Sequence, residues 1–265
     1  MSKIAVVTSK KYKSSNTFKK FISLLENSNK DFKVYFLNEI DSQSYTNIKL
    51  NLVVGIGGDG TALKAMKLGW LTNSAVVNLG SGRIGYLVNK IDQLNLNEII
   101  ELKTSEFKSR KPIIQNNDMK NPSFNEVVII KNAPTNLLDL EILTSEQEVK
   151  LRADGIIIST SMGSTAYNYS AGGPIVQTSN EVIILTPISP FTKFPRSIVL
   201  DGAAKLKVKI KKDQDVSIQF DGVESFNETL KENAEFNYEL SSKKLKLLNE
   251  KDEPKLTNFL NQILR

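Results

Sequence analysis

Hydrophobic positions in the first hundred residues follow two alternating patterns. Short runs of apolar residues at 3–9, 32–37, 51–57 and 74–80 predict buried strands. Residues 15–27 and 61–68 instead carry apolar side chains at helical spacing. Strands that alternate with helices form parallel sheets with crossover helices. We therefore predict an α/β N-terminal domain with a parallel sheet over residues 1–105.

Beyond residue 105 the pattern changes to short strands separated by turn residues. Such strands are predicted at 124–131, 138–144, 148–160, 181–188, 197–202, 204–212, 215–222 and 235–241. This pattern is typical of a layered or sandwich-like domain, so we predict a mostly β C-terminal domain over residues 106–244. Residues 255–265 have a helical period, and we expect the segment 245–265 to pack back on the N-terminal domain.

The amino-acid composition excludes several kinds of catalytic and metal-binding sites. The 265 residues include neither cysteine nor histidine. Disulfides, a thiolate nucleophile, a zinc–thiolate site and a Ser-His-Asp triad are therefore excluded. Acid–base chemistry must use Asp, Glu, Lys or Tyr.

The net charge of +6 changes the picture little. The lysines are scattered, and the densest run, at 205–212, alternates with apolar residues, as in a half-solvated strand. A nucleic-acid-binding role therefore ranks last, and we expect no nucleic-acid partner. The apolar run near the N-terminus is too short for a signal peptide or a membrane span, so we expect a cytoplasmic protein without a membrane partner.

A glycine-rich loop follows the predicted strand 51–57. The sequence Gly-Ile-Gly-Gly-Asp-Gly, residues 55–60, stands between a strand and a helix, where backbone N–H groups bind phosphates. We expect Gly57, Gly58 and Thr61 to belong to a phosphate-binding loop. Thr61 stands where a P-loop has lysine, and the next strand ends without the acidic residue of a Rossmann dehydrogenase.

Asp59 is an anion inside this loop. A carboxylate beside a phosphate is repelled unless a divalent cation lies between them, or unless the carboxylate takes a proton from an attacking hydroxyl. Both interpretations indicate phosphoryl transfer. A third interpretation is structural: Asp59-Gly60 forms a tight turn in which Asp59 caps the helix.

A second motif, Arg152 to Pro174, combines a strand with a loop rich in Gly, Ser and Thr. With it, the chain resembles the NAD kinase family, within the diacylglycerol kinase-like superfamily. Five motifs follow the family's order: Gly-Gly-Asp-Gly-Thr (57–61), Gly-Arg-Ile-Gly-Tyr (82–86), Asn-Glu (125–126), Asp-Gly with the Gly-Ser-Thr-Ala-Tyr segment (154–174), and Thr-Pro-Ile-Ser-Pro (186–190) leading to Arg196. The resemblance covers most of the chain.

The resemblance implies a role for each matching residue. Asp59 would be the proton acceptor that activates the 2′-hydroxyl of the adenosine ribose of NAD. Gly60 would lie against the ribose or the pyrophosphate. The remaining substrate-binding residues for NAD or NADP would be Asn125, Glu126, Arg152, Asp154, Thr165, Ala166, Tyr167, Asn168, Tyr169 and Ser170.

The resemblance also implies the molecules involved. ATP, or inorganic polyphosphate, would donate the phosphate with Mg²⁺ or another divalent cation; no metal-ligating residue is assigned. The nucleotide would bind in a cleft between the two domains, and the protein would form a homodimer or homotetramer.

Some residues depart from the family pattern. They are Gly80, Ser161, Phe191 and Val223, which bear on substrate and subunit contacts rather than on Asp59. Asp221-Gly222 is interpreted as a hairpin turn. A lipid kinase of the diacylglycerol or sphingosine type shares the Asp59 loop, and a non-catalytic NADP-binding sensor would keep the pocket; both remain alternatives.

Overall fold

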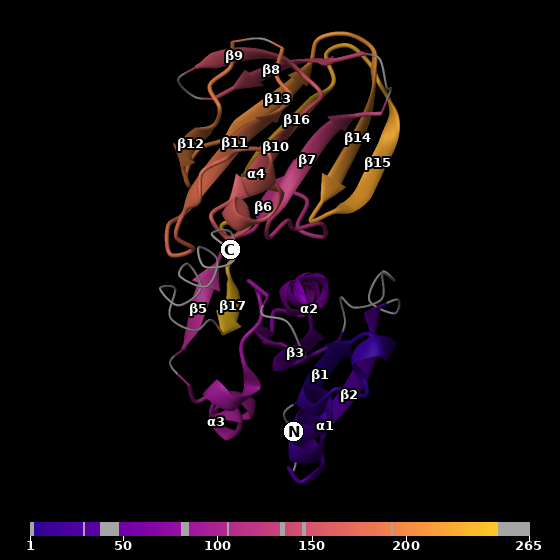
Figure 1. Ribbon diagram of the computed structural model, residues 1–265, viewed down its shortest axis with the longest axis vertical. Helices are drawn as coiled ribbons and strands as arrows, with labels where there is room; N and C mark the ends of the chain where they lie inside the picture. Colours follow the sequence, from indigo (N-terminus) through magenta and orange to yellow (C-terminus); the bar gives the residue numbers. More distant parts are fainter. Residues whose placement is uncertain are drawn as a thin grey trace. The chain divides into compact units, whose positions relative to one another are not determined.

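A computed structural model describes residues 3–28, 30–37, 48–80, 85–104, 106–132, 136–144, 147–191 and 193–248. The chain divides into two compact units (Figure 1). Unit 1 comprises the described residues up to Arg110 and those from Lys244 on. Unit 2 comprises Lys111–Lys243.

Unit 1 is built on a six-stranded sheet in the order β2-β1-β3-β4-β17-β5. Its first five strands in this order are parallel and β5 is antiparallel to β17. The bounds are β1 Lys3–Thr8, β2 Asp31–Phe36, β3 Leu52–Gly57, β4 Ala75–Gly80, β5 Phe107–Arg110 and β17 Leu245–Leu248. The prediction of an α/β domain with a parallel sheet is confirmed.

Helices cover both faces of this sheet. Apolar residues of α1 (Asn16–Glu26) and α3 (Leu96–Ile100) share one core with side chains of β1, β3 and β4. The side chain of Ser15 caps α1 by accepting a hydrogen bond from the Phe18 N–H. The longer helix α2 (Asp59–Thr72) covers the other face, where a Cβ on Gly69 would lie 2.2 Å from the Val76 side chain. Strand β3 and α2 therefore meet at the glycine loop, and close helix–sheet packing fixes where α2 begins.

Unit 2 contains two antiparallel sheets. One has the order β12-β11-β10-β7-β14-β15, with bounds Ile198–Asp201, Val182–Ile188, Gly155–Thr160, Glu126–Lys131, Gln214–Phe220 and Val223–Leu230. The other has the order β6-β16-β13-β8-β9, with bounds Ile113–Gln115, Glu235–Leu240, Leu206–Ile210, Leu138–Leu143 and Glu148–Ala153. One continuous core holds buried side chains from both sheets, so the sheets pack face to face. The layered β domain is confirmed.

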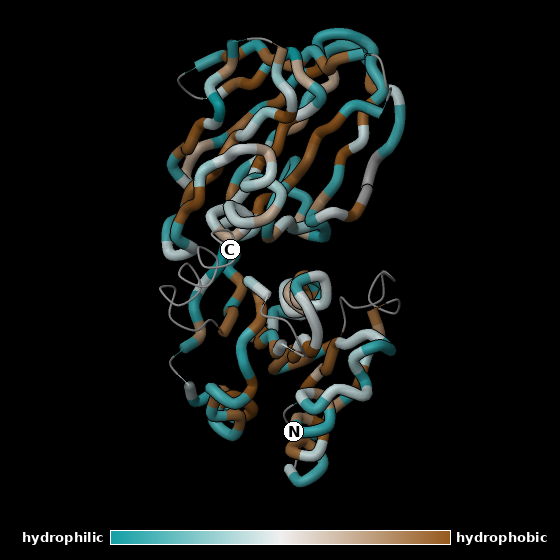
Figure 2. The backbone as a smooth tube through the Cα atoms, in the orientation of Figure 1, coloured by the Kyte–Doolittle hydropathy of each residue, from teal (hydrophilic) through white to brown (hydrophobic). Residues whose placement is uncertain are grey.

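In each unit, hydrophobic residues are concentrated in the strands (Figure 2). In β13 the buried residues Leu206, Val208 and Ile210 alternate with half-buried lysines, which confirms the half-solvated strand predicted there. The run 148–160, predicted as strand throughout, divides at Asp154 into β9 and β10, which belong to different sheets. That prediction was wrong in its continuity, because alternation along a chain does not reveal where a strand changes sheet.

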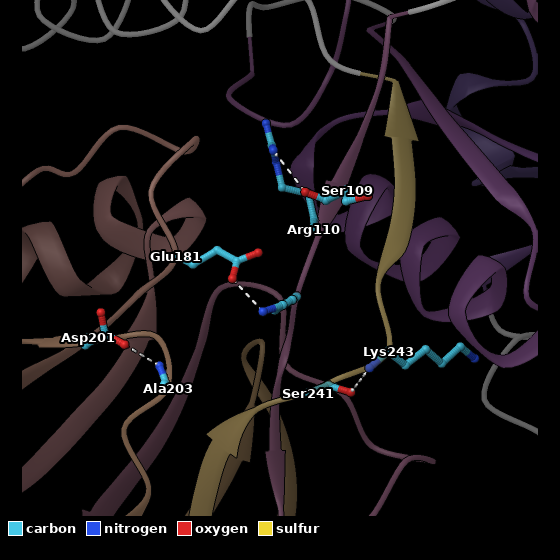
Figure 3. Close-up of polar contacts among 8 residues, drawn as sticks. Ser109, Arg110, Glu181, Asp201, Ala203, Ser241 and Lys243 are labelled. Carbon is cyan, nitrogen blue, oxygen red and sulfur yellow. Dashed lines mark hydrogen bonds and ion pairs between the residues drawn. The ribbon is translucent and has the colours of Figure 1, made fainter.

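The residues at which the chain enters and leaves unit 2, Lys111 and Lys243, each make a polar contact within the unit (Figure 3). The Lys111 ammonium lies 2.5 Å from a Glu181 carboxylate oxygen. The Lys243 N–H donates to the Ser241 hydroxyl oxygen at 3.1 Å. Unit 2 is therefore an insertion between β5 and β17, whereas the predicted boundaries were placed at residues 105 and 244. The helix predicted at 255–265 and the packing of residues 249–265 lie outside the described residues.

Candidate functional site

The glycine loop joins β3 to α2 in unit 1. Strand β3 ends at Gly57, and Gly58 is the extended N-cap residue of the helix. A Cβ on Gly57 would lie 2.5 Å from the Thr61 hydroxyl oxygen, so no side chain fits there. A Cβ on Gly60 would meet open space within 4 Å. The start of α2 therefore presents backbone N–H groups at an open edge, as an anion-binding helix N-terminus does.

Asp59 is the first residue of α2 and is half-buried. One carboxylate oxygen accepts a hydrogen bond from the Tyr86 N–H at 3.1 Å, and the other accepts one from the Leu87 N–H at 3.0 Å. A Cβ on Gly85 would lie 2.4 Å from the Asp59 Oδ1 atom, so this close approach requires glycine. Each carboxylate oxygen retains capacity for a second hydrogen bond.

These contacts decide between the interpretations of Asp59. The helix is capped by Gly58, without a side-chain hydrogen bond. The capping interpretation is therefore wrong, because the carboxylate faces the segment after β4 instead. Within the motif 82–86, residues 82–84 lie outside the described residues.

Tyr12 also lines the loop, and no motif or hydrophobic pattern predicted its role there. It ends a 3₁₀ turn, Lys10–Tyr12, that follows β1. Its ring atom Cδ2 would lie 3.0 Å from a Cβ on Gly57, and its hydroxyl 3.6 Å from one on Gly58. Strands β1 and β3 are parallel neighbours, so only the sheet order brings the residues after them together.

In unit 2, Asn125 and Glu126 lie at the start of β7. The Asn125 Oδ1 and Glu126 Oε2 atoms are buried and have no hydrogen-bond partner among the described residues. Glu126 is 6% exposed. Burial raises the pKa of the Glu126 carboxyl to about 8; the nearby Asp221 carboxyl adds to the rise, whereas a hydrogen bond from the Tyr167 N–H opposes it. These two buried side-chain oxygens without partners are suited to form hydrogen bonds with the hydroxyl groups of a sugar.

The loop after β10 packs against this pair. It consists of a 3₁₀ turn, Met162–Thr165, and the short helix α4, Tyr167–Ser170. A Cβ on Gly163 would clash with the Asn125 carbonyl, and the Tyr167 N–H donates a hydrogen bond to the Glu126 carboxyl. Of the predicted binding residues, Thr165 and Ala166 are half-buried, and Tyr167, Tyr169 and Ser170 are exposed. The structure therefore brings this loop together with Asn125 and Glu126.

Asn168 differs from its neighbours in the loop, because it is fully buried. Its amide donates to the carbonyls of Ser164 at 3.1 Å and Pro174 at 3.0 Å. Its side-chain oxygen accepts from the Thr186 hydroxyl at 2.6 Å. We interpret Asn168 as a residue that shapes the loop rather than one that contacts a ligand, since its amide is engaged inside the unit.

Asp154 lies at the other end of β10, just before its first residue, and Arg152 lies in β9. The antiparallel register pairs Ser159 with Glu126 and Gly155 with Ile130, and Asp154 forms an ion pair with Lys131 at 2.6 Å. Asp154 is thus about 15 Å along the strand from Ser159. The Arg152 side chain pairs with Asp139 at 2.8 Å and lies 5.7 Å from the centre of the exposed Phe191 ring. The structure does not bring these two predicted residues to Asn125 and Glu126 within one unit.

Two features are absent from the described residues. No cluster of three or more acidic side chains that could hold a metal ion occurs there. None of the helices in the described ranges has the length and apolar character needed to cross a lipid bilayer.

Comparisons with known proteins agree with this geometry. The family model of the ATP-NAD kinase C-terminal domain matches residues 124–249. An NAD kinase of Caldicellulosiruptor saccharolyticus is 33% identical over 235 residues, covering 86% of this chain and 86% of that protein.

Two solved structures share the fold. A crystal structure of an NAD kinase from Archaeoglobus fulgidus in complex with ATP superposes with a TM-score of 0.76 at 23% identity, covering 98% of each chain. A yeast NADH kinase complexed with NADH gives a TM-score of 0.79 at 20% identity, covering 100% of this chain and 87% of that one. Motif order, two-unit fold and sequence identity agree, and the chain belongs to the NAD kinase family.

Proposed function

We propose that this protein transfers the γ-phosphoryl group of ATP to the 2′-hydroxyl of the adenosine ribose of NAD, giving NADP and ADP. The C. saccharolyticus relative is named an NAD kinase, and the two solved relatives hold ATP and NADH. These findings support the reaction class and the nucleotide pair.

Asp59 carries the proposal. Its carboxylate is oriented by the Tyr86 and Leu87 N–H groups and stands at the N-terminus of α2. A carboxylate fixed beside a phosphate-binding loop is suited to accept the proton of the attacking hydroxyl. The O2′–P bond forms as the bond from the γ-phosphorus to its bridging oxygen breaks, and ADP leaves with that oxygen.

The phosphates would be held by the loop itself. Backbone N–H groups of Gly58, Asp59 and Gly60 face the triphosphate in this proposal, and Gly60 leaves room for it, whereas the Thr61 N–H donates to the Gly58 carbonyl. Magnesium would arrive bound to ATP as part of the substrate. The described residues contain no cluster of three acidic side chains, which suits an ion that is held mainly by substrate phosphates and one carboxylate.

The acceptor nucleotide would be recognised by unit 2. We propose that Asn125 and Glu126 bind the sugar hydroxyls, because a buried side-chain oxygen of each residue lacks a partner among the described residues. Thr165, Ala166, Tyr167, Tyr169 and Ser170 would line the adenine and ribose. Contacts of Arg152 and Asp154 with the nicotinamide half remain a prediction, as do a nucleotide shared by both units, the homo-oligomer and the cytoplasmic location.

A coupled assay tests the proposal. Purified protein is given NAD, ATP and magnesium, and NADP is detected with an NADP-specific dehydrogenase. For Asp59→Asn we expect kcat to fall about 100-fold or more, because the proton acceptor is lost, with the Kd for NAD nearly unchanged. Asp92→Asn is the matched control, since Asp92 is also an acidic residue in the first turn of a short helix of unit 1 and pairs with Lys20.

The other outcomes separate the alternatives. Asp59→Asn turning over at the wild-type rate would remove Asp59 from the reaction. NAD binding without phosphate transfer from ATP or polyphosphate would favour the sensor. Phosphorylation of diacylglycerol vesicles in place of NAD would favour the lipid kinase.

A further inference from the structure

Asp221 lies at the tip of the hairpin that joins β14 to β15. Its φ is 50° and that of Gly222 is 76°, as a two-residue type I′ turn requires, so the predicted hairpin turn is confirmed. Aspartate tolerates this left-handed conformation better than most residues. The turn alone therefore does not require a carboxylate, since Asn or Gly would serve as well.

The carboxylate of Asp221 binds a second segment, far away in sequence. Its Oδ1 atom accepts from the Asn125 N–H at 2.7 Å, the Glu126 N–H at 3.3 Å and the Ser123 hydroxyl at 2.8 Å. Its Oδ2 atom accepts from the Phe124 N–H at 2.8 Å. In return, the Asp221 N–H donates to the Glu126 carbonyl at 3.0 Å. Four consecutive residues, 123–126, thus converge on one side chain.

This carboxylate is buried, and burial raises the pKa of Asp221 while the four hydrogen bonds oppose that rise. Hydrogen bonds that concentrate on one buried acceptor fix the backbone that supplies them. The hydrogen bonds from residues 124–126 come from backbone N–H groups and do not use the side chains. The Asn125 Oδ1 and Glu126 Oε2 atoms have no partners among the described residues.

We propose that Asp221 is a positioning residue for nucleotide recognition, holding the turn 123–126 from behind so that Asn125 and Glu126 present their unpartnered side-chain oxygens to the sugar hydroxyls. The proposal rests on the proposed NAD kinase function. It assigns Asp221 to binding of the acceptor nucleotide and not to the transfer step.

Asp221→Asn tests this role with little change in volume or backbone preference. One carboxylate oxygen becomes an NH₂ group, which then faces a backbone N–H that it cannot satisfy. We expect KM for NAD to rise about tenfold while kcat stays within about threefold of wild type, because ground-state and transition-state binding are lost together. The Kd for NAD, measured by calorimetry, should rise in parallel.

Asp213→Asn is the matched control. Asp213 lies in the connection from β13 to β14, which belong to different sheets of unit 2, accepts the Glu232 N–H at 2.8 Å and pairs with Lys231 at 2.7 Å. The same substitution there should leave KM and kcat unchanged.

A double-mutant cycle separates positioning from general loss of structure. If Asp221 acts through Asn125, then Asn125→Ala combined with Asp221→Asn should raise KM by less than the product of the two single effects. Should Asp221→Asn fold poorly, Ser123→Ala serves instead. The Ser123 hydroxyl lies 2.8 Å from Asp221 Oδ1 and 2.5 Å from the Glu126 carbonyl, so a smaller rise in KM, about threefold, is expected.

The outcomes distinguish the two proposals. If wild-type protein makes NADP but Asp221→Asn behaves like Asp213→Asn, the positioning role is overturned and the kinase function stands. A loss of kcat at unchanged KM, or strictly multiplicative effects with Asn125→Ala, would also overturn it. If the wild type neither binds nor phosphorylates NAD, the proposed function fails and the positioning role falls with it.

Discussion

Two buried asparagines show how the units differ. Asn78 in β4 and Asn168 in α4 are both fully buried. The Asn168 amide has partners on both sides, from Ser164, Pro174 and Thr186. Neither side-chain atom of Asn78 has a hydrogen-bond partner among the described residues. Asn168 therefore fixes a loop of unit 2, whereas Asn78 is an amide buried beside the glycine loop of unit 1 without such a network.

The two aspartates show the same contrast. Asp221 is enclosed by four donors, while the half-buried Asp59 accepts two N–H groups and keeps capacity for more. A saturated carboxylate can hold backbone in place, and an oriented but unsaturated one can also take a proton. Similar hydrogen bonds from backbone N–H groups thus serve two different purposes.

Gly85→Ala should disturb Asp59 most strongly. The added Cβ would lie 2.4 Å from the Asp59 Oδ1 atom, so the carboxylate must turn away from the Tyr86 and Leu87 N–H groups. A displacement of about 1 Å can lower kcat about 100-fold. Steady-state kinetics in the coupled assay measure the loss, and thermal unfolding should show a stable protein. Full kcat in Gly85→Ala would mean that the orientation of Asp59 is unimportant.

The asparagine pair predicts unequal losses of stability. Asn168→Ala should lower the free energy of unfolding by about 3 kcal/mol, because two buried carbonyls and the Thr186 hydroxyl lose their partner. Asn78→Ala should change it by less than about 1 kcal/mol, because no hydrogen bond to the described residues is lost. Urea unfolding of both variants provides the measurement. An equal loss in both would show that Asn78 binds an internal water, and the contrast between the units would disappear.

Glu126 predicts an effect on the pH dependence of stability. Its pKa is raised from 4.5 to about 8, so the folded protein keeps a proton that the unfolded chain releases. The free energy of unfolding should therefore fall as pH rises from about 4.5 to about 8, by at most about 1.4 kcal/mol per pH unit, and level off above that. Glu126→Gln should flatten this slope in urea titrations at several pH values.

Asp213→Asn is again the control. Lys231 lowers the pKa of the exposed Asp213, so its contribution is lost only at acidic pH and the slope above pH 5 should not change. A wild-type slope that survives in Glu126→Gln would assign the proton to another group.

Much of the fold could be predicted because each unit has its own hydrophobic period. Helix α2 is longer than the predicted 61–68, since Gly58 caps its start and Asn73, in the left-handed region, ends it. Strands β15 and β17 had no prediction. The first is polar along much of its length, and the second has only four residues, so their pairing in the sheets defines them rather than any sequence pattern.

The motifs predicted the residues of the candidate site but not the contacts that those residues make. Asp59, Asn125 and Glu126 follow from the family's order of residues. Their hydrogen-bond partners do not, because Tyr86 is 27 positions from Asp59, and Asp221 is 96 positions from Asn125. Such contacts depend on a close glycine and on the register of a hairpin, which no local pattern encodes.

Strand β17 has a consequence for biosynthesis. It lies between β4 and β5 in the sheet of unit 1, although it follows the whole of unit 2 in sequence. Unit 2 is continuous from Lys111 to Lys243, so a growing chain can fold it as soon as those residues emerge from the ribosome. The sheet of unit 1 must wait for Leu248, because β17 pairs with β4 at Val76 and with β5, although Asn89 already pairs with β4 at Leu79. The unit that is translated first is therefore the unit that is finished last.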